Sequence, residues 1–290
     1  MSAVLPFLVS GVVIGSLYAL SGVGMLVLYR TTGVLNFAYG ALGATAGMAA
    51  WQLVEMLLQP LVALLLGVLA AAALSLLFGV VAGPALARTT ELGKATATLG
   101  LALALLGTMY TIWNDKARTL RLATDSTGFD AGGARVTATQ VLSLVLVAVV
   151  VAATSVFLQR SGAGTAMRAL AGDRELSAML GVRVRRVELM AWATSGALAG
   201  ISGLLLAAQT QLEPGYLTFL VIPALATVVV GRLVSLPGTL VGGLVLGVGQ
   251  ALVSYWPPTS SLASATPFVL AVVAVLYLQR HKTVTIEVAR

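Results

Sequence analysis

The sequence predicts an all-α, polytopic integral membrane protein with eight or nine transmembrane helices. Of its 290 residues, 59% are hydrophobic and only 9% are charged, whereas about 25% of the residues in a typical soluble domain are charged. The mean hydropathy is +0.99. The 17 basic and 10 acidic residues cannot cover a soluble surface of this size, because too much apolar area would face water. A soluble domain, a coiled coil and a disordered chain are therefore excluded.

Nine apolar segments divide the chain, and most approach the roughly 20 residues that a helix needs to cross a bilayer. The second segment follows Gly33 and is rich in glycine, and the seventh is short and contains Pro223. Either of these two can be broken or re-entrant, which a membrane tolerates where the backbone is buried in protein or lines a cavity. The segments lie near residues 4–28, 34–54, 61–87, 95–113, 137–158, 188–210, 217–231, 236–255 and 263–279.

The basic residues fall mainly on one side of the predicted membrane. If all nine segments span and the C-terminal tail is cytoplasmic, the cytoplasmic connections hold 13 Lys and Arg residues and the outside connections hold four. Cytoplasmic loops are enriched in Lys and Arg, so we expect the N-terminus outside and the C-terminus in the cytoplasm. A single transmembrane domain then covers residues 1–290, with an outside loop at 114–136 and a cytoplasmic loop at 159–187. The net charge of +7 needs no nucleic-acid partner.

Glycine pairs four residues apart occur within or beside several apolar segments. Small residues at this spacing form a flat helix face that another helix can approach closely, but the spacing does not say which helices meet. Ser10-Gly11 with Gly15 in the first segment and Ser195-Gly196 with Gly200 in the sixth follow the same pattern. The predicted topology gives these two segments opposite directions. An inverted repeat and chance similarity between glycine-rich helices both account for the pattern.

The sequence lacks the residues of most enzymes and metal sites. It contains no cysteine and one histidine, His281, in the basic tail, so a thiolate or histidine metal site is not expected. Gly93-Lys94-Ala95 lacks the earlier glycine and the hydroxyl of a phosphate-binding loop. Paired catalytic carboxylates and a nucleophile elbow are also missing. We therefore expect no enzymatic activity and no bound cofactor in this chain.

The apolar segments contain few ionisable residues, and those that come near, such as Glu55, Glu213 and Arg232, lie at predicted ends. Carriers driven by protons or ions usually need acidic or histidine groups at depth, so we expect the energy for transport to come from elsewhere. A substrate pathway would then have a neutral polar lining, with Asn36 as the best candidate. For each candidate, a hydrogen bond between helices is the alternative role. The candidates are Tyr18, Asn36, Tyr39, Thr45, Thr194, Ser195 and Thr227.

The cytoplasmic loop at 159–187 contains a short helix with clear start and stop signals. Asp173 is a good N-cap, and Gly181 is a good residue to end the helix. Leu176, Met179 and Leu180 fall on one face at helical spacing. A helix this short does not stand alone, so it needs the membrane surface, the rest of this protein or a soluble subunit as a partner. We expect Arg168 and Arg174 to be free for acidic groups of that partner.

These residues resemble the membrane-spanning permease subunit of bacterial branched-chain amino acid ABC importers, of the smaller of the two permease types. The resemblance covers nearly the whole chain. In ABC importers the permease loop carries a coupling helix with a Glu-Ala-Ala and a later Gly; here Glu175, Ala178 and Gly181 keep the Glu-to-Gly spacing, while Leu176 and Ser177 replace the two alanines. The motifs are Gly15-Ser-Leu-Tyr-Ala-Leu20, Tyr29-Arg-Thr-Thr-Gly-Val-Leu-Asn-Phe-Ala38, Ala166-Met-Arg-Ala169 with Asp173, Ala178 and Leu180-Gly181-Val182, and Leu236-Pro-Gly-x2-Val-Gly-Gly243.

The resemblance implies a transport subunit in the bacterial plasma (inner) membrane that moves branched-chain or other hydrophobic amino acids inward. It implies two separate ABC ATPase subunits that hold ATP and Mg²⁺, a second permease subunit (a paralogue or a second copy), and an extracytoplasmic substrate-binding protein that meets the outside loop. The short cytoplasmic helix would dock on an ATPase. Its coupling residues would be Arg168, Asp173, Arg174, Glu175, Leu176, Ala178, Met179, Leu180 and Gly181.

One departure from the family pattern leaves the solute open. The family tends to have Gln-Gly-Asp or a close variant after the Asn-Phe-Ala run, whereas this chain has Tyr39-Gly40-Ala41, without a carboxylate. Related permeases carry urea, short amides or aromatic acids, so the same machine for another small solute is the main alternative. An ion-coupled secondary carrier that works alone is a less favoured alternative.

Overall fold

The structure is a computed structural model of the whole chain. It describes residues 5–120, 124, 127–131 and 134–256, together with 265, 266, 269, 270, 272, 273 and 276. Most of the ninth predicted segment and the whole basic tail, with Arg280, His281 and Lys282, lie outside the described residues.

Among the described residues, six helices are long and apolar enough to cross a membrane. They coincide within a few residues with the first, third, fourth, fifth, sixth and eighth predicted segments, so those predictions are confirmed. The total of eight or nine spans stays a prediction. The six helices are α1 (Leu5–Thr32), α3 (Pro60–Leu86), α4 (Glu91–Trp113), α5 (Ala138–Arg160), α8 (Val184–Gln209) and α11 (Leu236–Tyr255).

The second and seventh predicted segments are shorter or broken, as their composition indicates. After α1 the chain turns at Gly33, which has a φ of 69°, and begins α2 (Tyr39–Glu55) only at Tyr39. The seventh segment forms α9 (Pro214–Phe219) and α10 (Val221–Val230), separated at Leu220. Pro223 lies three residues after this break, and because proline lacks an N–H and its ring clashes with the carbonyl four residues earlier, one continuous helix is disfavoured here.

A small β-hairpin interrupts the otherwise helical fold in the outside loop. Strand β1 (Gly128–Ala131) pairs antiparallel with β2 (Ala134–Thr137), with Gly128 opposite Thr137. Thr137 ends the hairpin and caps α5 in a reciprocal capping box with Gln140, an arrangement that satisfies two helix N-terminal groups at once. The hairpin is an addition to the predicted all-α fold, and it holds the outside loop directly above α5.

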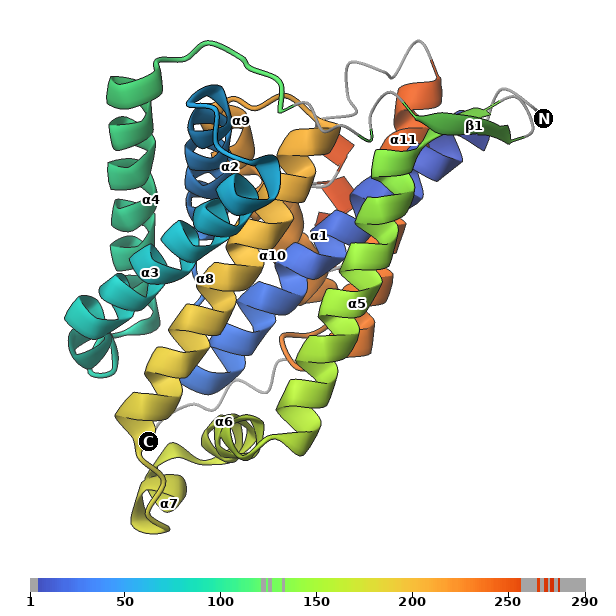
Figure 1. Cartoon of the computed structure of the whole chain (residues 1–290). Helices are drawn as coiled ribbons and strands as arrows, with labels where there is room; N and C mark the ends of the chain where they lie inside the picture. The colour runs from blue at the N-terminus through green and yellow to red at the C-terminus, as the bar shows by residue number, and fades with distance from the viewer. Residues whose placement is uncertain are drawn as a thin grey trace.

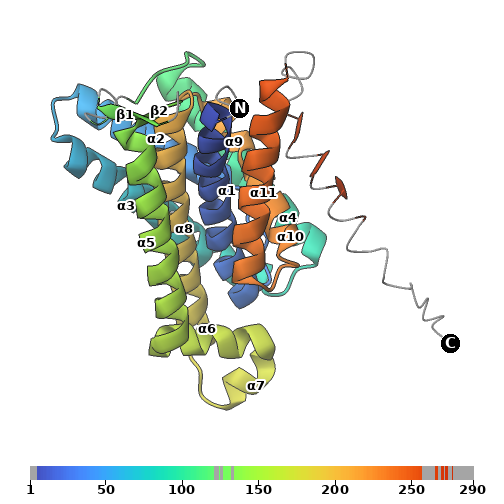
Figure 2. The same ribbon diagram turned by 90° about the vertical axis from the view of Figure 1, so that its right-hand side faces the viewer.

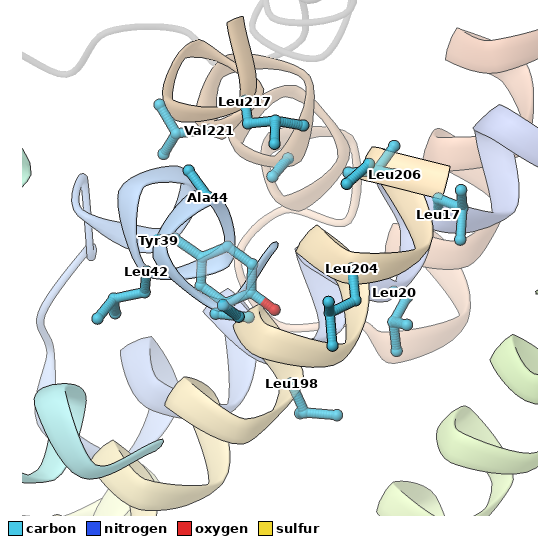
Figure 3. Close-up of a cluster of buried hydrophobic side chains, with 14 of the residues drawn as sticks. Leu17, Leu20, Tyr39, Leu42, Ala44, Leu198, Leu204, Leu206, Leu217 and Val221 are labelled. Carbon is cyan, nitrogen blue, oxygen red and sulfur yellow. The ribbon is translucent and has the colours of Figure 1, made fainter. Parts of the chain in front are cut away.

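The helices form one bundle around α1. Figures 1 and 2 show the N-terminal end of α1 and the hairpin at one end of the molecule, and α6 (Gly162–Gly172) and α7 (Arg174–Met179) at the other. The most apolar stretch of α1 is 89% buried, whereas the corresponding stretch of α5 is 11% buried. A helix that is hydrophobic all round and buried belongs to the core. Figure 3 shows part of that core, with Tyr39 surrounded by leucines from α1, α8 and α9.

Glycines set the distance between α1 and α11. Gly11 and Gly15 of α1 pack directly on the backbone of Gly243 and Gly247 of α11, and a Cβ added at Gly247 would overlap Gly15. Side chains at these positions would push the two helices apart. Two of the glycine pairs that the sequence analysis identified therefore meet each other, which the spacing alone did not determine.

The second glycine pattern makes an equivalent contact. Gly196 and Gly200 of α8 pack on α3, against Ala71 and Val68, just as Gly11 and Gly15 pack on α11. In both cases the second glycine contacts the partner helix about one turn earlier than the first. Helices α1 and α8 also run in opposite directions (Figure 2). The structure thus supports an inverted repeat of two halves, α1–α3 and α8–α11. The first helix of each half packs on the last helix of the other half.

The α1–α11 contact gives a stability prediction. We expect Gly247→Ala to lower the midpoint of thermal unfolding in detergent, because overpacking a tight contact costs about 1–3 kcal/mol. Gly107→Ala in α4 is the matched control, since no described atom lies within 4 Å of a Cβ added there. Equal stability of the two variants would contradict the role given to the α1–α11 contact.

The hairpin and helices α6 and α7 lie at opposite ends of the bundle (Figure 2), and this arrangement gives a prediction about membrane topology. The sequence has no cysteine, so a thiol reagent would label only a cysteine that is introduced by mutation. We expect Lys116→Cys to react with a membrane-impermeant maleimide in intact cells with a permeable outer membrane, and Leu180→Cys to react only after lysis. Labelling of Leu180→Cys in intact cells would reverse the orientation and remove the basis for an ATPase contact at 159–187.

Candidate functional site

The cytoplasmic loop at 159–187 forms two helices below the bundle, α6 and α7 (Figures 1 and 2). Ser161 caps α6, and its hydroxyl accepts the N–H of Gly164 at 2.9 Å. Met167 and Leu170 are buried in a cluster with Val27 and Leu28 of α1 and with Trp192 of α8. Helix α6 is therefore fixed to the ends of the two central helices that are predicted to lie in the cytoplasm.

The caps predicted for α7 are confirmed. The Asp173 carboxylate accepts the backbone N–H of Leu176 at 2.9 Å. Gly181 has a φ of 86°, a conformation that favours glycine. Its N–H donates to the Ala178 carbonyl at 3.0 Å, and the N–H of Val182 donates to the Ser177 carbonyl at the same distance. The chain thus closes α7 on both sides and turns back towards α8.

The apolar face of α7 is exposed in the part of the chain that the structure describes. Leu176 is 50% exposed, Met179 78% and Leu180 77%. From Asp173 to Gly181, the one buried residue is Ser177, whose hydroxyl donates to the Asp173 carbonyl at 2.6 Å. Sequence reasoning missed Ser177 because it occupies an alanine position of the family motif. A capped helix that exposes three large apolar side chains presents a docking surface.

Of the two arginines expected to be free, Arg174 is paired within this chain, so the prediction was wrong for Arg174. A guanidinium nitrogen of Arg174 lies 2.7 Å from a carboxylate oxygen of Glu188 in the first turns of α8. A largely buried carboxylate needs a cation, and the chain reversal at Gly181 brings α7 next to it. Arg168 donates to the Gln159 carbonyl at 3.2 Å and contacts the Thr165 hydroxyl at 3.4 Å. Both arginines position the loop within this chain.

Three of the predicted lining residues converge on the middle of α1. Tyr18 of α1 donates its hydroxyl to Gln250 of α11 at 3.0 Å. Thr227 of α10 is fully buried against Gly22, and the Tyr39 hydroxyl of α2 lies against Gly24. Segments far apart in the sequence therefore place hydroxyls around α1. Gln250 was not among the predicted residues, although a lone amide in an apolar helix is the signal that points to it.

Asn36 lies in the turn before α2 and is fully buried. Its side-chain oxygen accepts the N–H of Ala38 at 3.0 Å, while its side-chain nitrogen has no hydrogen-bond partner. Thr98 of α4 supports the same turn, because its hydroxyl accepts from the Phe37 N–H at 3.3 Å and lies 3.2 Å from the Leu35 carbonyl. Asn36 thus shapes the turn, and its side-chain NH₂ group is not used by the described residues.

The remaining predicted lining residues lie apart from this group. The Thr45 hydroxyl donates to the Ala41 carbonyl at 2.8 Å and faces Met109 of α4. The Thr194 hydroxyl donates to the Met190 carbonyl at 2.7 Å. The first of these hydrogen bonds lies within α2, and the second lies within α8. The Ser195 hydroxyl is buried without a partner.

The space between α2, α8 and α9 is nearly closed. A cavity of about 10 Å³ lies among Tyr39, Gly43, Ser202 and Leu217, which is roughly the space that one water molecule needs. Gly40 packs on the carbonyl of Thr218, so a side chain at this position would clash. An amino acid does not fit in this cavity.

Helix α4 stands at the edge of the bundle (Figure 1) and presents an unpartnered face. Thr96, Gly100, Gly107 and Thr111 are exposed and lie along one stripe of the helix. No described atom lies within 4 Å of a Cβ added at Gly100 or Gly107. Stripes of small and hydroxyl residues are typical of contacts between membrane helices.

Metal-binding groups are sparse in the part of the chain that the structure describes. No cluster of three or more His, Cys, Asp or Glu residues occurs there.

Comparison with known proteins identifies the family. Residues 7–278 match the family described as the permease component of the branched-chain amino acid transport system. A LivH permease of Escherichia coli is 26% identical over 268 residues, with 86% of each chain covered. A BraD permease of Pseudomonas aeruginosa is 27% identical over 258 residues, with 84% of each chain covered. A probable LivH permease of Methanocaldococcus jannaschii is 26% identical, covering 84% of this chain and 79% of the relative.

A solved structure shares the fold. PsaBC from Streptococcus pneumoniae, in complex with Fab, is matched over 95% of this chain and 90% of that chain, with a TM-score of 0.50 and 11% sequence identity. The likeness concerns the arrangement of helices alone. The match over residues 7–278 shows that this membrane protein belongs to the family of branched-chain amino acid transport permeases and is a transport subunit, not an enzyme.

Proposed function

We propose that this chain is the membrane-spanning subunit of an ATP-driven importer that carries branched-chain or other hydrophobic amino acids across the plasma membrane. The observation that carries the proposal is the exposed, capped helix α7 below a bundle that has few charges. The named relatives support the solute, since LivH and BraD are called branched-chain amino acid transport permeases.

Helix α7 is the proposed contact with an ATPase. Leu176, Met179 and Leu180 offer an exposed apolar surface to a groove on a soluble subunit. Two ATPase subunits would hold ATP and Mg²⁺, because this sequence has no phosphate-binding loop of its own. Force applied to α7 would reach α8 through the ion pair of Arg174 with Glu188.

The unpartnered stripe of α4, defined by Thr96, Gly100, Gly107 and Thr111, supports a second permease subunit. A second copy of this chain and a paralogue both fit the stripe. The solute pathway would then lie between the two subunits, because the cavity beside Tyr39 measures about 10 Å³, whereas ligand pockets usually measure about 300–1,000 Å³. Tyr18, Asn36, Tyr39 and Thr227 are proposed to line the pathway when the helices separate.

The start of the outside loop offers a surface for a substrate-binding protein. The guanidinium of Arg118 lies 4.7 Å from the centre of the Trp51 ring and donates to the backbone carbonyls of Lys116 and Trp113. The backbones of Arg118 and Leu212 exchange two hydrogen bonds of 3.0 Å. These contacts tie the loop after α4 to the end of α8. We propose that the binding protein docks on this surface and on the hairpin.

Coupling can be tested at Gly181. We expect Gly181→Val to lower solute-stimulated ATPase activity and transport together, because a φ of 86° costs roughly 1–2 kcal/mol for residues other than glycine and more for β-branched side chains. Gly181→Asn is the matched control, since asparagine tolerates this conformation. The double variant Asp173→Ala, Glu175→Ala should also be weakened, as loss of an N-cap costs about 0.5–2 kcal/mol.

The affinity of the substrate-binding protein for its solute should be unchanged in all these variants. Full coupling of both Gly181→Val and the double variant in reconstituted liposomes would refute the ATPase contact and leave α7 as a membrane-surface helix.

The pathway can be tested at Asn36. We expect Asn36→Leu and Asn36→Ser to lower uptake roughly tenfold or more, because a hydrogen bond to a charged group contributes about 1.5–3 kcal/mol. Serine keeps an acceptor for the Ala38 N–H, so Asn36→Ser should assemble normally. Normal uptake by an assembled Asn36→Ser complex would show that the amide donor does not contact the solute.

A further inference from the structure

A second cavity, of about 300 Å³, lies at the cytoplasmic end of the bundle and has no role in the proposed transport cycle. It is formed by the ends of α1 and α3, the start of α8 and the first residue of α7. Its lining combines arginines with apolar groups. The residues are Thr32, Val34, Gly79, Gly83, Pro84, Leu86, Ala87, Arg88, Arg174, Val184, Arg185, Glu188, Leu189 and Trp192.

The rim of this cavity is cationic. Arg88 follows α3, Arg174 begins α7 and Arg185 lies in the first turn of α8. Glu188 is the acidic residue of the lining, and it is already paired with Arg174. Among the described residues, neither Arg88 nor Arg185 forms an ion pair. Two unneutralised guanidinium groups from different helices therefore face one cavity and favour an anion.

The floor of the cavity is apolar and open. Trp192 packs edge-on against Phe78 with ring centres 5.4 Å apart. Pro84 is exposed, and no described atom lies within 4 Å of a Cβ added at Gly83. An anion that fits here needs an apolar portion as well as a negative charge.

The surface of α3 beside Pro84 and Arg88 of the cavity lining is apolar and exposed. Leu77 and Val81 are 58% and 73% exposed, and with Pro84 and Arg88 they form a stripe at helical spacing along α3. This stripe runs from the apolar part of a span to an arginine at its cytoplasmic end. Pro84 and Arg88 belong both to this stripe and to the cavity lining, so an acyl chain on the stripe would lie next to a head group in the cavity.

From these observations we infer that the cavity binds an anionic phospholipid of the cytoplasmic leaflet. The phosphate would lie between Arg88 and Arg185, and an acyl chain would follow Gly83, Pro84 and Val81 along α3. Basic pockets between membrane helices on the cytoplasmic side bind acidic head groups. Because Arg174 of α7 is part of the rim, the lipid would contact the helix proposed to dock on the ATPase. The inference does not depend on which solute is carried.

Lipid binding to the purified full chain tests the inference. Native mass spectrometry would measure titration with phosphatidylglycerol, with phosphatidylcholine as the uncharged comparison. We expect the wild type to prefer phosphatidylglycerol. The double variant Arg88→Gln, Arg185→Gln should bind it roughly 30-fold more weakly, since each basic residue near an anionic surface contributes about fivefold to binding. The matched control is Arg183→Gln, Arg186→Gln, which removes two exposed arginines outside the cavity.

A second variant tests the apolar floor without a change of charge. Gly83→Leu fills open space, so the variant should fold normally, which thermal unfolding would check. Its binding of phosphatidylglycerol should nevertheless be weakened. If the two arginine double variants lost phosphatidylglycerol binding equally, the loss would reflect general surface charge, and the proposed site would be wrong. Unchanged binding in Gly83→Leu, equal binding of both lipids by the wild type, or equally tight binding of inorganic phosphate would each overturn the assignment to a phospholipid.

Discussion

The close approach of glycine-bearing helices is the constraint on which the rest of the structure depends. In a bilayer, no hydrophobic effect draws helices together, because lipid is as apolar as the side chains. Packing must then come from backbone proximity, and Gly15 on Gly247 provides it between α1 and α11. The contact of Gly200 with Val68 provides it between α8 and α3. These two contacts hold α1 and α8 at the centre and leave α3, α4 and α5 with exposed faces.

A rigid centre with exposed outer helices explains why the cytoplasmic loop can act on the whole molecule. Met167 and Leu170 attach α6 to the ends of α1 and α8, while α7 stays exposed. A partner that moves α7 therefore acts on the two most buried helices. The outer helices retain apolar or small-residue faces, which suit lipid and a second subunit. Under the proposed function, the surface that contacts the ATPase is thus separate from the surfaces that meet the membrane.

The parts of this structure that depend on local sequence were predictable, and those that depend on distant contacts were not. The caps at Asp173 and Gly181 follow from residues within a few positions of each other, and six spans follow from composition. The pairing of Arg174 with Glu188 was missed because it requires the chain reversal between α7 and α8. The bond from Tyr18 to Gln250 joins residues 232 positions apart. Proximity of this kind is set by helix packing.

Helix α8 connects the two surfaces proposed for partners. Its 26 residues extend about 39 Å at 1.5 Å per residue, enough to cross the membrane. At its cytoplasmic end Glu188 binds Arg174 of α7, and just beyond its outer end Leu212 pairs with Arg118 of the outside loop. Between these ends, α8 packs closely on α2 and α3. Under the proposed function, ATPase docking and substrate-protein docking would bias the same helix, and the energetic coupling between them must then be reciprocal.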